Sequence, residues 1–201
     1  MMKIFEGVRV LVWDLDGTLF GEKEELTREF RRHLYEIVAE RLGVSWKEAK
    51  RRFERRQKKL WGTTITANSF GLDGYWVVAE VQRRIDWRRF LKRDERLVRW
   101  LGELKKSYRQ ILLTDNTEET AREKLKILGV EGVFEKWFCG LDLRVTKPDK
   151  RLFKMVLDYT GLPAKQHLMI GDRLEKDIEP AKAVGMKTWW VREGVGRFME
   201  G

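Results

Sequence analysis

The sequence contains little cysteine, histidine or proline, and each scarcity narrows what the protein can be. One cysteine, two histidines and three prolines occur among 201 residues. A single cysteine, Cys139, excludes an internal disulfide framework. No histidine lies near it in the sequence to activate it, so we expect a small buried side chain rather than a catalytic thiol. We expect His33 and His167 to be ordinary surface or helix residues and not metal ligands.

Long apolar runs are also missing. No segment approaches the roughly 20 consecutive apolar residues of a membrane-spanning helix, and the N-terminus lacks the pattern of a signal peptide. We therefore expect a cytoplasmic protein without membrane contact, acting as a monomer or a homodimer. A chain of 201 residues that is 42% hydrophobic is long enough for one domain with a small insertion.

Charge, in contrast, is abundant and uneven. The formal net charge is +10, and residues 21–92 alone hold 18 Lys and Arg against 11 Asp and Glu, a net of +7. The densest basic run extends from Lys47 to Lys59. Such an excess favours an anionic partner, nucleic acid included, or a solvated helical surface. We prefer the solvated surface and keep nucleic-acid binding as the alternative.

The hydrophobic pattern after residue 92 alternates between strand and helix. Short apolar runs, typical of buried strands, occur at 10–13, 111–113, 133–138, 168–170 and 187–191. Helical patterns separate them, the last at 174–184. Strands that alternate with helices indicate a parallel sheet covered on both faces. We therefore predict an α/β protein with a Rossmann-like parallel-sheet core.

Residues 21–92 interrupt this alternation with a purely helical pattern. The sequence predicts a helix that ends at Gly43, a helix that begins at the capping box Ser45–Glu48, a loop over 63–74 and a helix over 75–84. We expect a small all-helical cap domain of residues 21–92, inserted into a core of residues 1–20 and 93–201. Because the insertion follows the first strand, the cap is a candidate lid over the strand ends.

Two carboxylates mark the end of the first predicted strand, in the motif Asp14-Leu15-Asp16-Gly17-Thr18. Side chains at positions i and i+2 of a strand share one face, so Asp14 and Asp16 would repel each other. A cation or a proton must offset that repulsion. The motif therefore predicts a site for a hard cation at the carboxyl end of the strand.

Polar residues also follow the later strands. The segments are Thr114-Asp115-Asn116, Thr146-Lys147-Pro148-Asp149 and Gly171 to Asp177, the last with Asp172 near its start. Each alone could be a turn, a helix cap or a solvated lysine. Together, at one edge of a parallel sheet, they offer carboxylates for Mg²⁺, a hydroxyl and an ammonium. That combination is typical of a phosphoryl-transfer site.

With these motifs in this order, the chain resembles the haloacid dehalogenase (HAD) superfamily, and in particular its phosphatase branch with a helical cap after the first motif. The resemblance implies a Mg²⁺-dependent phosphatase that hydrolyses a small phosphomonoester, such as a nucleotide or a sugar phosphate, through an aspartyl-phosphate intermediate.

The resemblance also implies a role for each motif residue. Asp14 would be the nucleophile, Asp16 the general acid and base, and Thr114 and Lys147 the groups that hold the phosphoryl oxygens and offset charge. The implied metal ligands are Asp14, the backbone carbonyl of Asp16, Asp172 and Asp177. The implied substrate contacts are Leu15, Asp16, Thr114, the backbone amide of Asp115, Lys147 and Trp61.

Trp61 enters that set from the cap, where we expect Trp61 or Trp76 to line the substrate pocket and Trp46 and Trp87 to lie in the core of the cap. Asp115 departs from the family, which commonly has asparagine there. We expect its side chain to turn away from the phosphate, so that only its backbone N–H is used. A side chain that points inward would weaken the phosphatase assignment or require a cation to pair with it.

Other chemistries within the superfamily are disfavoured. A haloacid dehalogenase lacks an aspartate at the position of Asp16, and a phosphonate hydrolase would need a lysine of the cap as a Schiff base. The alternative from another class is a nucleic-acid-binding or regulatory protein on a HAD-like core.

Overall fold

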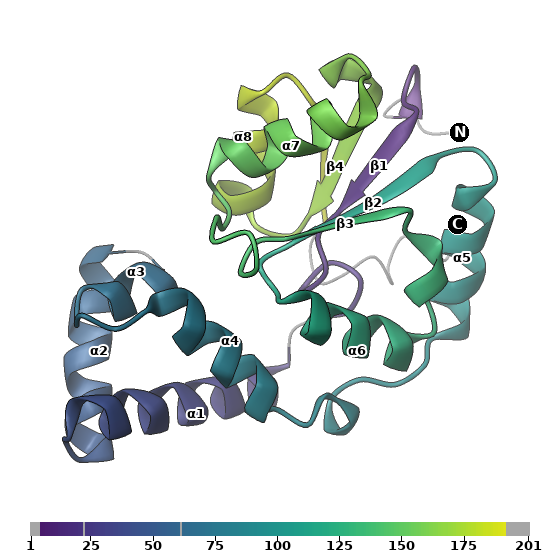
Figure 1. The fold of residues 1–201 in the computed structure, drawn as a ribbon. Coiled ribbons are helices and arrows are strands. Elements are labelled where there is room, and N and C mark those ends of the chain that lie inside the picture. Colours follow the sequence, from purple (N-terminus) through teal and green to yellow (C-terminus); the bar gives the residue numbers. More distant parts are fainter. Residues whose placement is uncertain (1–4, 22, 61, 192–201) are drawn as a thin grey trace. The chain divides into compact units, whose positions relative to one another are not determined.

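The structure is a computed structural model that describes residues 5–21, 23–60 and 62–191. It divides into two compact units, coloured by sequence in Figure 1. The core unit combines the chain up to residue 22 with the chain from residue 91 onward, and the cap unit is Lys23–Phe90. These limits lie two residues from those expected at each junction. The role of the cap unit as a separate domain or lid stays a prediction.

A five-stranded parallel sheet forms the centre of the core unit, in the order β3-β2-β1-β4-β5 (Figure 1). The strands are β1 (Val10–Trp13), β2 (Arg109–Thr114), β3 (Lys136–Cys139), β4 (His167–Gly171) and β5 (Lys187–Trp190). Trp13 is in register with Leu112 on one side and with Ile170 on the other. The residues just beyond β1, β2 and β4 therefore meet at one edge, and the predicted α/β class is confirmed.

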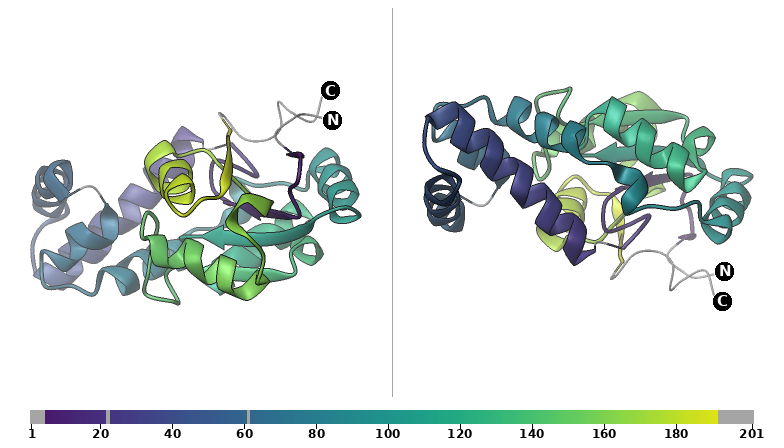
Figure 2. Two further views of the ribbon diagram at one scale, coloured as in Figure 1. Left: turned by 90° about the horizontal axis from the view of Figure 1, so that it is seen from above. Right: turned by 90° about the horizontal axis from the view of Figure 1, so that it is seen from below.

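Alternate residues of β1 face opposite layers of helices, which explains why the strand is apolar at every position. Leu11 and Trp13 belong to the hydrophobic cluster that includes α5 (Glu95–Lys105) and α6 (Glu118–Leu128). Val10 and Val12 belong to the cluster that includes α7 (Lys150–Thr160) and α8 (Glu179–Ala183). Figures 1 and 2 show these helix pairs on opposite faces of the sheet.

The helices of the core unit begin and end where short local signals predict. Asp94, Thr117 and Asp149 accept hydrogen bonds from backbone N–H groups as N-caps of α5, α6 and α7. Gly129 and Gly161 end α6 and α7 in the left-handed conformation. Most strand limits lie within one or two residues of those expected, and two differences are larger. The strand expected from residue 133 begins only at Lys136, after the 3₁₀ turn η3 (Glu131–Val133).

The second difference concerns the helix expected over 174–184. The chain there forms a π-helical turn, η5 (Leu174–Ile178), before the short helix α8. A wider turn is often found at functional sites. Here it places Asp177 with its backbone N–H bonded to the carbonyl of Arg173, and its side chain 1% exposed.

The cap unit consists of α1 (Glu24–Leu42), α2 (Trp46–Leu60), α3 (Thr63–Asn68), α4 (Gly74–Arg84) and the 3₁₀ turn η2 (Trp87–Arg89). Helix α1 packs against α2 and α4, and α3 packs against α2 and α4. The predicted loop over 63–74 is wrong in its first half. Thr66 and Ala67 are buried in α3, so tertiary packing stabilises a turn and a half of helix that its composition does not signal. None of the helices in the described ranges has the length and apolarity of a membrane span.

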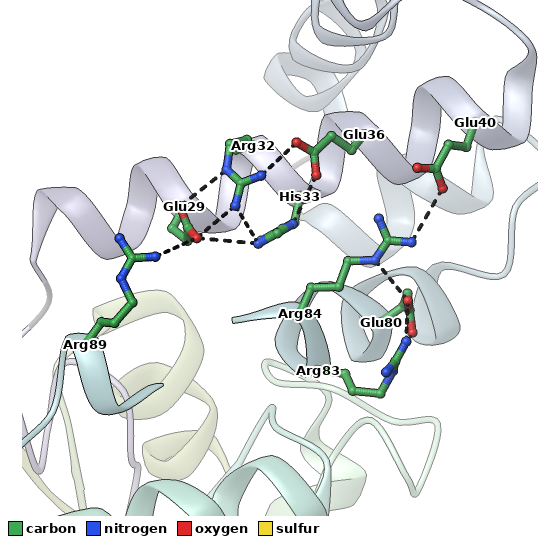
Figure 3. Close-up of polar contacts among 9 residues, drawn as sticks. All are labelled: Glu29, Arg32, His33, Glu36, Glu40, Glu80, Arg83, Arg84 and Arg89. Atoms are coloured by element: carbon green, nitrogen blue, oxygen red, sulfur yellow. Dashed lines mark hydrogen bonds and ion pairs between the residues drawn. The ribbon is translucent and has the colours of Figure 1, made fainter. Parts of the chain in front are cut away.

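Ion pairs connect α1 to the end of the cap unit (Figure 3). Arg84 of α4 pairs with Glu80 at 2.9 Å and with Glu40 of α1 at 3.5 Å, and Arg89 of η2 pairs with Glu29 of α1 at 3.3 Å. His33 of α1 lies between Glu29 and Glu36 and is 8% exposed, so of the two expected kinds, surface or helix residue, it is a helix residue with a buried side chain. The two histidines are therefore both buried, since His167 is 0% exposed.

The tryptophans of the cap unit divide differently from the prediction. Trp87 is buried, as expected, but Trp46 is 40% exposed and lies with its ring edge against Tyr35. Trp46 therefore packs against the buried Tyr35 while it remains partly exposed to solvent. Trp76 is 39% exposed, and the Arg41 guanidinium stacks over its ring at 4.1 Å. Trp61 lies outside the described residues.

Candidate active site

Three carboxylates converge at the carboxyl edge of the sheet. Asp14 follows β1, Asp172 follows β4 and Asp177 lies in η5, and each offers one oxygen within 4.8 Å of the others. Thr18 reaches two of them, with Oγ1 at 3.3 Å from Asp14 Oδ2 and from Asp172 Oδ1. Hard carboxylate oxygens in such a group suit Mg²⁺ better than a softer metal ion.

Lys147 joins this acidic group from the segment before α7. Its Nζ donates to Asp14 Oδ1 at 2.5 Å and to Asp177 Oδ1 at 2.6 Å. Burial raises the pKa of Asp14 well above its ordinary value; Lys147 opposes the rise, and Asp177 adds to it. Burial by itself would lower the pKa of Lys147, but Asp14 and Asp177 raise it, so the lysine is held as a cation.

Two glycines allow the acidic side chains to approach the backbone. Gly17 has φ of 80°, and a Cβ atom there would lie 2.4 Å from Asp172 Oδ2. A Cβ atom on Gly171 would lie 2.4 Å from the Cβ of Asp177. Both distances are well inside van der Waals contact, so both positions require glycine for space, and Gly17, with its positive φ, requires it for backbone conformation as well.

Asp16 does not join the three carboxylates, although it is only two residues from Asp14. Its Oδ2 accepts from Asn116 Nδ2 at 2.5 Å and its Oδ1 accepts from Lys124 Nζ at 2.6 Å. Strand geometry predicted that Asp14 and Asp16 share one face. Strand β1 already ends at Trp13, however, and the two side chains lie in different groups. Only the backbone carbonyl of Asp16, as the resemblance implies, would be available to a metal ion.

Thr114 ends β2 next to Asp16. Its Oγ1 accepts from the backbone N–H of Asn116 at 3.3 Å and from Asn116 Nδ2 at 2.6 Å. Because a hydroxyl group has one hydrogen and two lone pairs, this arrangement leaves the hydrogen of Thr114 to be donated elsewhere. The expected role of Thr114 as a donor to a phosphoryl oxygen agrees with this geometry.

The side chain of Asp115 has partners of its own. Oδ1 accepts from the backbone N–H of Lys147 at 2.8 Å, and Oδ2 accepts from Lys176 Nζ at 3.0 Å. A cation, Lys176, therefore pairs with this carboxylate. The bond to Lys147 also connects the end of β2 to the segment that carries the site lysine.

Two further contacts in the predicted set can be placed less directly. The Leu15 side chain is fully buried in the hydrophobic cluster of the core, so only its backbone could meet a substrate. Trp61 lies outside the described residues, and its place in a substrate pocket stays a prediction.

Cys139 is 5% exposed, and burial raises the pKa of its thiol to about 12, in line with a structural rather than a nucleophilic role.

The sequence reasoning missed three residues of the site, which are Lys124, Asn116 and Lys176. A signal for Lys124 was present in α6, where it interrupts the apolar helix face formed by Ala121, Leu125 and Leu128. A lysine in such a row must be buried or must change the helix orientation, and here it is 1% exposed. Asn116 belongs to the polar segment that the sequence places after β2, but no role in the site was assigned to it.

The balance of charge in the site favours a divalent cation. Five carboxylates, those of Asp14, Asp16, Asp115, Asp172 and Asp177, face three lysines, Lys124, Lys147 and Lys176. A divalent ion among Asp14, Asp172 and Asp177 would offset the two excess negative charges. The residues present therefore fit the Mg²⁺ that the sequence predicts.

The basic run of the cap unit is partly neutralised within its own helix. Arg51 and Arg52 of α2 both pair with Glu48, at 2.7 and 2.6 Å. Arg56 stacks over the Phe70 ring at 4.0 Å and donates to the carbonyl of Ser69. These contacts agree with the preferred explanation of a solvated helical surface.

Comparison with known proteins covers most of the chain at the level of the family. The family model for haloacid dehalogenase-like hydrolases matches residues 8–185. That match includes the whole cap unit and most of both segments of the core unit, up to the residues before β5.

Curated relatives match over shorter segments. The chain is 38% identical over 87 residues to a glyceraldehyde 3-phosphate phosphatase of Pyrococcus abyssi, over 43% of this chain and 37% of the relative. It is 31% identical over 104 residues to the N-acylneuraminate-9-phosphatase of Rattus norvegicus, over 51% and 42% of the two chains. A phosphoserine phosphatase of Thermus thermophilus is 33% identical over 84 residues, 42% of this chain and 34% of the relative. The chain thus matches less than half of the length of each relative.

Solved structures match over nearly the whole chain but with lower identity. A HAD phosphatase from Thermococcus onnurineus has a TM-score of 0.67 at 24% identity, with 92% of this chain and 86% of the other covered. A 2-haloacid dehalogenase from Pseudomonas syringae has a TM-score of 0.59 at 18% identity, with 91% and 86% covered. Because a phosphatase and a dehalogenase both match, these similarities establish the fold and not the reaction. With the family model matched from residue 8 to residue 185, the chain belongs to the haloacid dehalogenase-like hydrolases.

Proposed function

We propose that this protein is a Mg²⁺-dependent phosphatase that hydrolyses a small phosphomonoester through an aspartyl-phosphate on Asp14. The observation that carries the proposal is the convergence of Asp14, Asp172 and Asp177 around Lys147, with Asp16 held separately by Asn116 and Lys124. Asp14 thus lies among the candidate metal ligands beside a cation, and Asp16 lies outside that group.

The two separated carboxylates suit two different roles. A carboxylate oxygen of Asp14 attacks phosphorus as the bond from phosphorus to the leaving oxygen breaks, and Asp16 gives that oxygen a proton. A water molecule then attacks phosphorus and gives a proton to Asp16 as the bond between phosphorus and the Asp14 oxygen breaks. Phosphate leaves, and both carboxyl groups return to their starting states. Lys147 and the hydroxyl of Thr114 would neutralise and orient the phosphoryl oxygens.

Asp14, Asp172, Asp177 and the backbone carbonyl of Asp16 would hold the metal ion, which when bound supplies positive charge beside the phosphoryl group. The side chains of Asp172 and Asp177 also fix Thr18 and Lys147 around Asp14. Asp16 separates this proposal from a dehalogenase. A phosphomonoester expels an alcohol oxygen, which needs a proton from a general acid, whereas the halide expelled by a dehalogenase needs none.

The test is release of phosphate by the purified protein, measured with p-nitrophenyl phosphate and with a panel of small phosphomonoesters. The panel should include nucleotides, sugar phosphates, glyceraldehyde 3-phosphate, N-acylneuraminate 9-phosphate and phosphoserine, the last three named for the relatives. We expect activity that requires Mg²⁺ and falls by at least about a thousandfold in Asp14→Asn, as expected for loss of a nucleophile.

A protein that binds Mg²⁺ but releases phosphate from no member of the panel would contradict the proposal. Salt-sensitive binding to nucleic acid by the same preparation would then favour the alternative of a binding protein on a HAD-like core. Exposed Lys126, on the outer side of α6, provides a control variant, Lys126→Met, that should keep full activity.

A further inference from the structure

Lys124 is a buried cation whose ammonium group hydrogen-bonds to two side chains of the site. It projects from α6, is 1% exposed, and its Nζ lies 2.6 Å from Asp16 Oδ1 and 2.7 Å from Asn116 Oδ1. Burial of an ammonium group is costly unless the group is paired and hydrogen-bonded. Since an apolar residue at this position would continue the helix face, the lysine needs an explanation beyond packing.

The partners of Lys124 form a hydrogen-bonded network around Asp16. Because an ammonium group can only donate, Asn116 must turn its Oδ1 toward Lys124. Its Nδ2 then faces Asp16 Oδ2 at 2.5 Å and Thr114 Oγ1 at 2.6 Å. One lysine therefore fixes Asp16 in two ways, directly through one oxygen and through the Asn116 amide at the other.

We propose that Lys124 is a positioning residue that holds the carboxyl group of Asp16 where it exchanges a proton with the leaving group and with water. This inference rests on the proposed phosphatase function. Each carboxylate oxygen keeps a second lone-pair direction after it accepts one hydrogen bond, so the network orients Asp16 without occupying it completely. Lys124 itself contacts Asp16 and Asn116 and acts through them.

Leaving-group dependence separates this role from a purely structural one. Nitrophenolate leaves without a proton, whereas a poorer leaving group depends on the general acid. A general acid typically raises the reaction rate by a factor of about 10² to 10⁴. A series of phenyl phosphates, from p-nitrophenyl to unsubstituted phenyl, keeps the shape of the substrate similar while its leaving group changes. The ratio kcat/KM reports the first half of the reaction, in which Asp16 is the acid.

The central experiment compares wild type, Lys124→Met, Asp16→Asn and the double variant across this series. We expect Lys124→Met to lower kcat/KM for phenyl phosphate by about tenfold more than for p-nitrophenyl phosphate, a fraction of the full contribution of a general acid. Asp16→Asn should show the same trend more strongly. In the Asp16→Asn background, Lys124→Met should cause no further loss, because the residue acts through Asp16. Lys126→Met, from the same helix, should match wild type for every substrate.

An equal loss for all substrates, or losses that multiply in the double variant, would overturn the positioning role while leaving the phosphatase proposal intact. A wild-type protein without activity on the series and the wider panel would overturn the proposed function and the role of Lys124 with it. Lys124→Gln, which keeps a donor toward Asp16, serves if Lys124→Met does not fold, and should give an intermediate effect. A crystal structure of either variant with Asp16 still bonded to Asn116 in its wild-type position would also contradict the inference.

Discussion

The core and cap units each contain a cluster of acidic and basic side chains. The ion-pair distances in the two clusters are similar, but one cluster is buried and the other is exposed to solvent. In the core unit, Lys147 lies 2.6 Å from Asp177, with 3% and 1% of the two side chains exposed. In the cap unit, Arg83 lies 2.8 Å from Glu80, with 65% and 12% exposed (Figure 3). Bond length is therefore a poor guide to energetic importance. Water and ions can replace a partner at the surface, whereas a buried charge that loses its partner has no substitute.

The largest effect on stability is expected where a buried cation is removed. Lys147→Met leaves Asp14 and Asp177 facing each other without the ammonium group that joins them. We expect the free energy of unfolding to fall by about 3 kcal/mol, as for other broken buried pairs. Urea unfolding in the presence of a chelator measures this, and a variant as stable as wild type would remove the distinction between the two clusters.

A smaller effect is expected from Gly17→Ala, because the new Cβ would displace Asp172. Gly7→Ala is a matched control, since Gly7 also has positive φ, 67°, but has no atom within 4 Å of the position of a Cβ. Both variants should lose about 1 kcal/mol of stability from the left-handed backbone. Only Gly17→Ala should also lose phosphatase activity, by about tenfold or more if Asp172 holds the metal ion. Equal activity of the two variants would contradict the close fit of the site.

His167 is a buried titratable residue outside the active-site cluster, and its burial should make stability depend on pH. Its Nε2 lies 2.7 Å from Thr160 Oγ1 and its Nδ1 lies 3.1 Å from the carbonyl of Pro163. Burial lowers its pKa in the folded protein. The unfolded chain therefore binds a proton more readily below about pH 6.5, and stability should fall as pH decreases through that range.

The comparison is between wild type and His167→Gln, with unfolding free energies measured at pH 7.5 and pH 5. Wild type should lose more stability on acidification than the variant does. Parallel losses would show that His167 contributes nothing to the pH dependence.

The smallest effect is expected in the exposed cluster of the cap unit. Arg83→Met removes a guanidinium group that pairs with Glu80, but Arg84 also donates to Glu80 at 2.9 Å. We expect a change of less than about 0.5 kcal/mol in the free energy of unfolding. Chemical denaturation at low and high salt gives this value, and a loss near that of Lys147→Met would make the two clusters equivalent.

That these site residues lie together could be predicted from the sequence, because parallel strands bring their carboxyl ends to one edge of the sheet. Asp14, Lys147, Asp172 and Asp177 were found in this way, and the structure brings them together. Partners that come from a helix were missed. Lys124 reaches Asp16 across 108 residues of sequence, and no local pattern states which buried group a lysine will meet.

Errors in the prediction have the same origin. The segment 63–68 has the composition of a loop but forms α3 because the packed helices of the cap unit bury Thr66 and Ala67. Trp46 has helical spacing but covers Tyr35 from the outside. In both cases the local sequence was neutral or misleading, and contacts with distant segments decided the outcome.

The sequence by itself determined the alternation of strands and helices, the helix ends at Gly43, Asp94, Thr117 and Gly129, and the first motif with its two aspartates. These features follow from periodicity, capping and backbone conformation, which act over a few residues. Only the tertiary structure decided that Asp14 and Asp16 belong to different groups, one among the acidic residues with Lys147 and one with Asn116 and Lys124. The physical reason is that β1 ends at Trp13, so the turn at Gly17 and the burial of Lys124 set the direction of each carboxylate.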